Sequence, residues 1–416
     1  MSKIFILLLY LIFALQPQFC SGSDYKTILG GKDKNVEEGL IFSNKYAQMA
    51  FLNSSIHSGS ITGGDFGIMP RSDVNGKHTL DESEARIRMF LRPDVRVRTA
   101  MRRPTAIHGE ADWLLQKAPQ GVKYSRKYKR DSYEVNAFLQ VVMDPVNARI
   151  DFETVLHNSG KRACLVDFTP EFTFLRNGVE PLQLELRREI IRYVDGVRKN
   201  FLNNETTIMD PKNRNSWWWR RVARDYKGFK NYFNREIIPF THPRLIPPDM
   251  FGFTELLGNT TLIWVPDKAS SMNQLTVEWE AEHGSAAPLW TYKLEPGEKK
   301  TVKFRMLTVK GLRHFDEVGD RWVFGYHAEG DLLSVLAVPL APHDRLSLTT
   351  TVSDSHNQVL INQRSEIAAM TPYAPGKVDL RASTPFQINA VYPIKLLLSS
   401  LEDNSRILEA AGNIVP

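Results

Sequence analysis

Three tryptophans stand side by side at 217–219, and two arginines follow them directly. A strand or an amphipathic helix buries only one or two of three adjacent indoles, because neighbouring side chains point in different directions. Indole faces can stack on the apolar faces of pyranose rings, while arginine pairs with uronate or sulfate groups. The candidate sugar-contacting residues of this segment are Trp217, Trp218, Trp219, Arg220, Arg221 and Tyr226. The alternative is that some of these rings anchor the segment to its domain, and a membrane-surface role is third because the segment lacks an apolar face.

Carboxylates recur at every second position in "TVEWEAEH", so a strand would place Glu278 and Glu282 on one face and Trp279 on the other. His242 lies in a proline-flanked stretch whose stiff backbone could hold a side chain at the edge of a cleft. A carboxylate or histidine so placed could act as a general base. The candidate catalytic residues are His242, Glu278 and Glu282, with Trp279 and Trp290 as further candidates for sugar contact. The alternative is that the glutamates form a solvated outer face.

Other chemistries find no support in the spacing of the chain. The ten histidines show no zinc-ligand spacing, and no nucleophile elbow, phosphate loop or dinucleotide fingerprint is present. We therefore expect neither a metal nor a cofactor. The net charge of +6 is mild for 416 residues and does not indicate nucleic acid as a partner. Basic residues nevertheless cluster at 86–103 and 123–130, which makes an acidic polymer a candidate partner, with a solvated strand face as the alternative.

The elements that must position these residues are mostly strands. Period-two alternation of apolar and polar residues recurs at 87–101, 133–175, 260–311 and 332–402, separated by Gly, Asn, Asp or Pro turns. This pattern predicts a mainly all-β chain built as sandwiches. A helical stripe is expected in part of Leu182 to Asn200, within a partly helical excursion around 180–250 that carries the three tryptophans. Long excursions of this kind tend to be binding or lid elements.

The first residues have the features of an export signal. Lys3 precedes the apolar run from Ile4 to Leu15, and small residues precede a cut before Ser23. We expect secretion or a periplasmic location. Lipoprotein anchoring through Cys20 is disfavoured by the bulky Phe19, and no other stretch is long and apolar enough to cross a membrane. Once the signal is removed, Cys164 is the only cysteine, so no internal disulfide can form, and its apolar strand predicts a buried small hydrophobe.

The late strands carry a family resemblance. The segment "YKLEPGEKKTVKFRMLTVKGL", residues 292–312, joins two strands by an L-x-PGE turn and resembles the last strands of galactose-mutarotase-like supersandwich domains. "LIFSNKYAQMAFLNSSIHSGSI" is similar to their opening strand, and "ARIDFETVLHNSGKRACLVDFTPEFTF" to their central pair. The C-terminal part resembles a small appended immunoglobulin-like domain. After the signal at 1–22, the resemblance implies a large antiparallel supersandwich at 23–312 and an immunoglobulin-like sandwich at 331–416. Charges and glycines break the strand rhythm between them, so we expect a linker at 313–330.

That family includes epimerases, polysaccharide lyases, glucan-handling proteins and carbohydrate-binding modules, so the fold does not select among them. Its epimerases use a strand-end histidine motif, whereas here Asn158 is followed by Ser159 and Gly160 and then by two basic residues. Epimerisation is therefore less expected than lyase or hydrolase action. The resemblance implies a secreted carbohydrate-active or carbohydrate-binding protein for a polysaccharide or oligosaccharide, with acidic glycans included. The alternative is a non-catalytic envelope or extracellular interaction protein.

Overall fold

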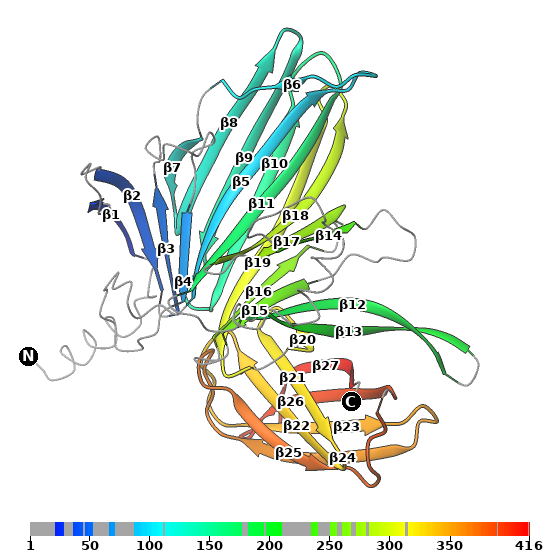
Figure 1. Ribbon diagram of the computed structural model, residues 1–416. Helices are drawn as coiled ribbons and strands as arrows, with labels where there is room; N and C mark the ends of the chain where they lie inside the picture. The colour runs from blue at the N-terminus through cyan, green and yellow to red at the C-terminus, as the bar shows by residue number, and fades with distance from the viewer. Residues whose placement is uncertain are drawn as a thin grey trace, which may run out of the picture.

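The computed structural model describes residues 21–28, 36–44, 46–52, 66–70, 87–110, 113–176, 182–194, 197–209, 234–239, 250–255, 260–267, 272–279, 283–312, 315–388, 390–414 and 416. Every regular element in these ranges is a β-strand, and all strand pairs are antiparallel (Figure 1). The predicted all-β class is confirmed. No helix in the described ranges has the length and apolar character needed to cross a membrane.

Two large sheets form the main body. The ten-stranded sheet runs in the order β1 (Ser21–Ile28), β2 (Val36–Ser43), β3 (Ala47–Leu52), β4 (Phe66–Pro70), β5 (Ile87–Thr99), β11 (Cys164–Arg176), β18 (His283–Leu294), β17 (Gln274–Trp279) and β14 (Asn234–Pro239), with β6 (Ala106–Ile107) paired to β5. The nine-stranded sheet runs in the order β13 (Val197–Met209), β12 (Leu182–Val194), β15 (Met250–Glu255), β16 (Thr260–Pro266), β19 (Lys299–Lys310), β10 (Arg149–Asn158), β9 (Tyr133–Met143), β8 (Gly121–Arg130) and β7 (Leu114–Ala118).

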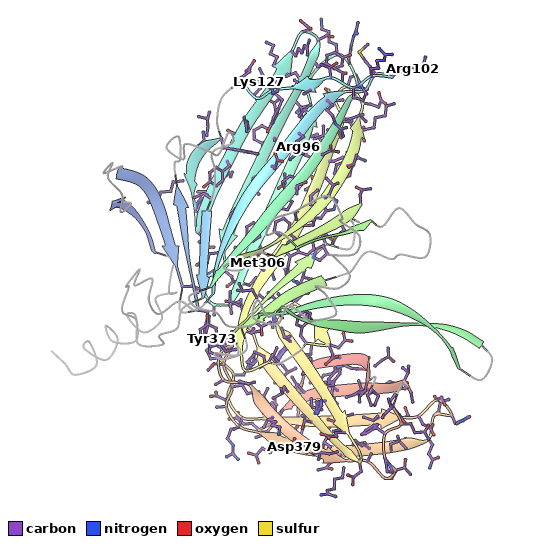
Figure 2. The ribbon with its side chains drawn as sticks, viewed as in Figure 1. Arg96, Arg102, Lys127, Met306, Tyr373 and Asp379 are labelled. Atoms are coloured by element: carbon purple, nitrogen blue, oxygen red, sulfur yellow. The ribbon has the colours of Figure 1, made fainter. Side chains whose placement is uncertain are left out.

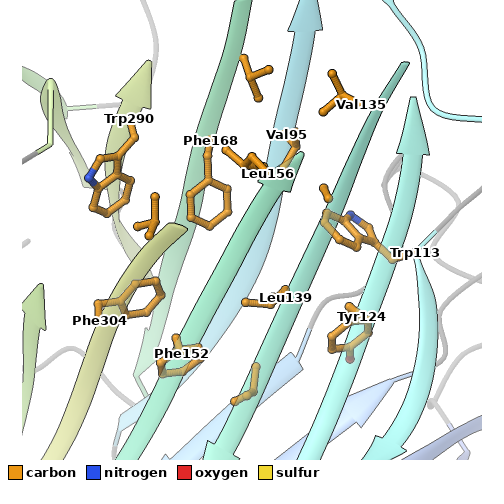
Figure 3. Packing of buried hydrophobic residues seen from close by; sticks show 14 of the residues in the cluster. Val95, Trp113, Tyr124, Val135, Leu139, Phe152, Leu156, Phe168, Trp290 and Phe304 are labelled. Carbon is orange, nitrogen blue, oxygen red and sulfur yellow. The ribbon is translucent and has the colours of Figure 1, made fainter. Parts of the chain in front are cut away.

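Strand alternation creates the core between these sheets. In β9, alternate residues from Tyr133 to Met143 are buried, while the residues between them face outward and are partly or well exposed. The ten-stranded sheet contributes Val95, Phe168 and Trp290 to the same core, whose packing is shown in Figure 3. Burying a large side chain of this kind stabilises the fold by about 1.5–3 kcal/mol. Cys164 is fully buried here, and desolvation raises the pKa of its thiol to about 11, which confirms its prediction as a buried small hydrophobe.

The β10–β11 and β18–β19 turns interlock at one end of the sandwich. Asn158 donates its backbone N–H to the Glu298 carbonyl over 3.0 Å, and its own carbonyl accepts from Gly297 N over 2.8 Å. Gly297 has φ +79°, a left-handed conformation that glycine adopts without steric cost. The Asn158 turn and the Pro-Gly-Glu turn of the sequence are therefore two halves of one structural joint.

The C-terminal unit is a second antiparallel sandwich. Its two sheets run β20 (Glu317–Val318), β21 (Trp322–Glu329), β22 (Leu332–Pro339), β25 (Gly376–Arg381) and β24 (Val359–Ile367), β23 (Leu346–Ser353), β26 (Tyr392–Ser400), β27 (Arg406–Ile414). β20 and β21 fall within residues 313–330, which the sequence pattern assigns to a linker. Gly319, Asp320 and Arg321 lie in the short β20–β21 turn, which is closed by Gly319 N and the Trp322 carbonyl over 2.8 Å, whereas Gly325 lies within β21.

The two units share an apolar junction. Leu307 and Val309 from β19 cluster with Phe315 and with Val338 and Leu340 of the C-terminal unit, and all five are fully buried. Backbone hydrogen bonds cross the same junction, from Ala148 N to the Leu340 carbonyl over 2.7 Å and from Lys310 N to the Pro372 carbonyl over 2.9 Å. The lower end of the main body in Figure 1 is therefore packed directly on the second sandwich.

The helix expected in residues 182–200 is not present. This stretch forms β12 and the beginning of β13, which pair antiparallel over their full lengths. The physical reason is visible in the first residues, where Leu182, Leu184 and Leu186 alternate with polar residues at the strand period. Pairing of 182–187 with β15 adds a third strand, and this tertiary hydrogen bonding outweighs the helical propensity of leucine, glutamate and arginine.

Candidate functional site

Most of the predicted site residues lie outside the described ranges. These residues, whose roles stay predictions, are Trp217, Trp218, Trp219, Arg220, Arg221, Tyr226, His242 and Glu282. The predicted signal at 1–22 also lies outside them, apart from Ser21 and Gly22 at the start of β1. Glu278 and Trp279 lie in β17, where Glu278 is opposite Arg235 and Ser285 in the strand register.

Trp290 is a core residue and not a ligand-contacting one. Its side chain is fully buried, and its ring lies 5.8 Å from the Phe168 ring and 5.8 Å from the Trp264 ring, centroid to centroid. Because both neighbours belong to the core, no face of this indole is open to a sugar. The predicted substrate-binding role is therefore corrected to a packing role between the two large sheets.

The described residues bring a different set of polar side chains together on the outer face of the nine-stranded sheet. A hollow of about 540 Å³ lies there, bounded by strands of that sheet and by the β20–β21 turn of the C-terminal unit. Its lining residues are Gln140, Val142, Arg149, Asp151, Phe152, Glu153, Val265, Pro266, Asp267, Lys303, Phe304, Arg305, Val318 and Asp320.

The strand register explains why these side chains meet. Gln140, Glu153 and Lys303 are aligned across β9, β10 and β19 in one row. Val142, Asp151 and Arg305 form the next row. Same-face residues two positions apart on a strand are about 6.5–7 Å apart, so the rows form a compact polar grid.

Ion pairs order this grid. Lys303 Nζ lies 3.3 Å from Glu153 Oε2, and Arg149 donates from Nε to Asp151 Oδ1 over 2.8 Å. These side chains remain partly exposed, with 51% of Lys303 and 43% of Glu153 accessible. The surface therefore presents charged donors and acceptors that are held in place and still open to a ligand.

The C-terminal unit supplies one wall of the hollow. Arg305 binds the Asp320 carboxylate and donates to the Gly319 carbonyl over 3.3 Å. The hydrogen bond from Arg305, followed by its charge, lowers the pKa of Asp320 from its ordinary value. Asp320 therefore stays ionised at neutral pH, and the hollow depends on both units for its shape.

An aromatic ring adjoins the hollow. Phe138 projects from β9 two residues before Gln140, on the same outer face, and 48% of it is exposed. Its neighbours in the register are Ser125 of β8 and Val155 of β10. An exposed aromatic ring beside a polar grid combines the two kinds of surface that a sugar ring contacts, an apolar face and hydroxyl partners.

The sequence contained a signal for this site. In "YEVNAFLQVVM" the outward positions are otherwise polar near the centre, so Phe138 breaks the alternation at an exposed position. The cross-strand rows could not be found in this way, because they require the register of three strands that are distant in the chain. Within the described ranges, no three His, Cys, Asp or Glu side chains gather as metal ligands do.

Comparison with known proteins gives structural likeness only. No protein-family model and no curated protein matches the chain. A galactose mutarotase-like protein from Clostridium acetobutylicum is 8% identical, with a TM-score of 0.41, over 70% of this chain and 99% of its own. A putative aldose 1-epimerase from Escherichia coli K12 is 8% identical, with a TM-score of 0.34, over 70% and 100%. The galactosidase domain of an alpha-galactosidase-sucrose kinase is 8% identical, with a TM-score of 0.35, over 65% and 40%. At these values the likeness assigns no activity to this chain.

Proposed function

We propose that this protein binds a carbohydrate at the hollow on the outer face of the nine-stranded sheet. The observation that carries the proposal is the exposed Phe138 ring beside a grid of accessible charged and amide side chains. The volume of about 540 Å³ lies within the range of about 300–1,000 Å³ typical of small-molecule sites. Phe138 would stack on the apolar face of a pyranose, and Gln140 and Glu153 would bond its hydroxyls.

The ion pairs favour binding over turnover. A general acid or base must exchange a proton with the substrate, and the two carboxylates from β10, Asp151 and Glu153, are each engaged by a cation. We therefore place a carbohydrate-binding role ahead of a lyase or hydrolase. The second candidate is a non-catalytic extracellular or envelope interaction protein. This candidate differs from the first in that the protein would bind no glycan.

We also propose that the C-terminal unit is immunoglobulin-like. The chain forms β21 and β22 in one sheet, crosses for β23 and β24, returns for β25 and crosses again for β26 and β27, a Greek-key order. Tyr392, the first residue of β26, accepts a hydrogen bond at its hydroxyl from Gln387 N over 2.7 Å. A tyrosine at this position bonded to upstream backbone is a hallmark of such sandwiches.

We also propose that the N-terminal segment directs export of the protein.

A glycan panel tests the proposed function. We expect at least one oligosaccharide to bind in calorimetry, and Phe138→Ser to weaken that binding about tenfold through loss of the stacking contact. Glu153→Gln should weaken it as well, while the control Ile388→Ser, at a residue 82% exposed in the C-terminal unit, should bind like the natural protein. The proposal would be contradicted if no glycan bound. It would also be contradicted if Phe138→Ser and Glu153→Gln both bound the glycan as tightly as the natural protein does. Release of new reducing ends or unsaturated uronates would assign an enzyme in place of a binding protein.

A further inference from the structure

Four turns gather at the end of the main body away from the C-terminal unit. We call this surface the basic end and define it as residues 99–105, 127–134, 157–163 and 293–300. These ranges connect β5 to β6, β8 to β9, β10 to β11 and β18 to β19. Figure 2 shows Arg102 and Lys127 together at this end, while Asp379 lies at the opposite extreme of the molecule.

Backbone hydrogen bonds make the four turns one continuous surface. The β10–β11 turn is at the centre, since Lys161 N donates to the Ser132 carbonyl over 2.8 Å and Ala163 O accepts from Ala100 N over 3.3 Å. Asn158 joins the same turn to the fourth through the Glu298 carbonyl. The charges on these turns are therefore presented to a ligand on one continuous surface.

The basic end carries a charge excess as large as that of the whole chain. It contains ten lysines and arginines and four carboxylates, a balance of +6, which equals the net charge of +6 for all 416 residues. Among the described residues, six of its exposed cations form no salt bridge: Arg102, Arg103, Lys129, Lys161, Arg162 and Lys299. The remaining chain is balanced, so the excess is focused at one end.

Intramolecular stability does not account for this focusing. Like charges held on adjoining turns repel one another and oppose the folded state unless a counter-ion or ligand neutralises them. The joint formed by Asn158 and Gly297 holds the turns together without help from the cations. A surface of this kind raises the local concentration and the association rate of an anionic partner.

We propose that the basic end is a second binding surface, which holds an acidic polysaccharide through its uronate or sulfate groups. Ser159 is exposed at this end, where its hydroxyl accepts from Asn136 Nδ2 and donates to Glu134 Oε1 over 2.8 Å each, and it adds a polar group that a hydroxyl-rich chain can contact. In the described turns no aromatic ring is exposed, since Tyr128 and Tyr133 are both buried. Single-stranded nucleic acid binds through exposed aromatic platforms, so this surface fits it poorly. One exposed methionine, Met101, gives little apolar area to insert into a membrane.

The basic end is separate from the hollow. On β9 the basic end stops at Glu134, and Phe138 beside the hollow follows four residues later, which corresponds to roughly 13 Å along a strand. The proposal therefore stands or falls independently of carbohydrate binding at the hollow. Variants at one surface should leave the other unaffected.

The test compares two triple variants of the full chain with the same change in net charge. One is Arg102→Ser, Arg103→Ser, Lys161→Ser, and the control is Lys377→Ser, Arg381→Ser, Lys395→Ser, at exposed positions of the C-terminal unit. The probes are polygalacturonate, heparin and neutral dextran, titrated at several salt concentrations. We expect polygalacturonate or heparin to bind, dextran not to bind at this end, and the first variant to lose about tenfold in affinity with a shallower salt dependence. The control should keep the natural affinity, and Phe138→Ser should leave binding of the acidic polymer unchanged.

Three results would overturn the proposal. The first is no salt-dependent binding of either acidic polysaccharide, and the second is an equal loss in the two triple variants, which would indicate a response to net charge alone. The third is that an oligothymidylate or phosphatidylserine vesicles bind more tightly than the acidic polysaccharides do, and that this binding is weakened to the same extent by the triple substitution of Arg102, Arg103 and Lys161. Thermal unfolding of both variants shows whether a loss of binding reflects a loss of folding.

Discussion

Asn158 organises the far end of the large sandwich through its side chain as well as its backbone. Its Nδ2 donates to the carbonyls of Arg162 and Leu294, each over 2.9 Å, and its Oδ1 accepts from Gly160 N over 3.0 Å. The residue is fully buried, so these polar groups have no water as a substitute partner. One side chain thereby joins the β10–β11 turn to β18, and the turns of the basic end depend on it.

Replacement of Asn158 by alanine should lower the free energy of unfolding by about 3 kcal/mol, because buried backbone groups lose their partners. Urea unfolding measures this change. The matched control is Asn136→Ala, which removes one exposed hydrogen bond to Ser159 and should cost under about 1 kcal/mol. Equal stabilities for the two variants would show that the buried joint is not important for the fold.

For single residues, the sequence shows which side chains could contact a sugar, but it does not show directly which of them point into the core and which point outward. Trp290 looked like Trp279, a tryptophan in a strand next to polar residues, yet it is buried. The alternation Trp290, Tyr292, Leu294 marks a single apolar face and could have identified the core position. Phe138 shows the converse, since an aromatic residue at an outward strand position is exposed beside the hollow where we propose carbohydrate binding.

The β12–β13 ribbon is the element for which sequence pattern and structure differ most. Among the strands that the structure describes, residues 182–187 of β12 pair with both β13 and β15, while the remainder of β12 pairs with β13 alone. In Figure 1 this ribbon extends beyond the body of the molecule. A two-stranded ribbon is marginally stable in water, and its backbone hydrogen bonds open more easily than those of a central strand.

Hydrogen exchange should therefore show a gradient along β12. Amides in 188–194 and in the paired part of β13 should exchange faster than those in 182–187. All of them should exchange faster than β10, which lies between β9 and β19 in the centre of the sheet. Mass spectrometry of exchanged peptides measures the order. Equal protection of the outer ribbon and β10 would mean that the ribbon is covered by another part of the protein.

The incorrect prediction of a helix in residues 182–200 has a physical cause. Residues 188–200 contain arginine, glutamate and isoleucine in an order compatible with a helical stripe, and a short apolar run cannot settle the period. The outcome is decided by the partner strands of β12, which are β13 and, more than 50 residues away in the chain, β15. Tertiary pairing of this kind is outside the reach of local pattern.

For the whole molecule, the junction between the sandwiches couples the hollow to the C-terminal unit. The Arg305 side chain reaches from β19 to Asp320 in the β20–β21 turn, beside the shared apolar cluster. Alternation predicted the two-sandwich organisation, because each strand set has its own inward face. It placed a linker where β20 and β21 lie, because short strands with charged turns resemble loops in sequence.

The Arg305–Asp320 pair should make stability depend on pH in acid. Because the folded pKa of Asp320 lies below its ordinary value of 3.8, its contribution is present above that pH and is lost as pH falls through the folded pKa. The difference in unfolding free energy between the natural protein and Asp320→Asn should thus be largest above about pH 4 and shrink below it. Urea unfolding at a series of pH values measures the difference, with Asp131→Asn at the basic end as a control. A difference that does not change with pH would rule out the pair as its source.

The most direct test of carbohydrate binding at the hollow is a crystal structure of the protein with the tightest-binding neutral oligosaccharide from the panel, a glycan that the basic end is not expected to hold. We expect a sugar ring stacked on Phe138, with its hydroxyls within hydrogen-bonding distance of Gln140 and Glu153 in the hollow. A sugar bound on another surface, with the hollow open to solvent, would contradict it.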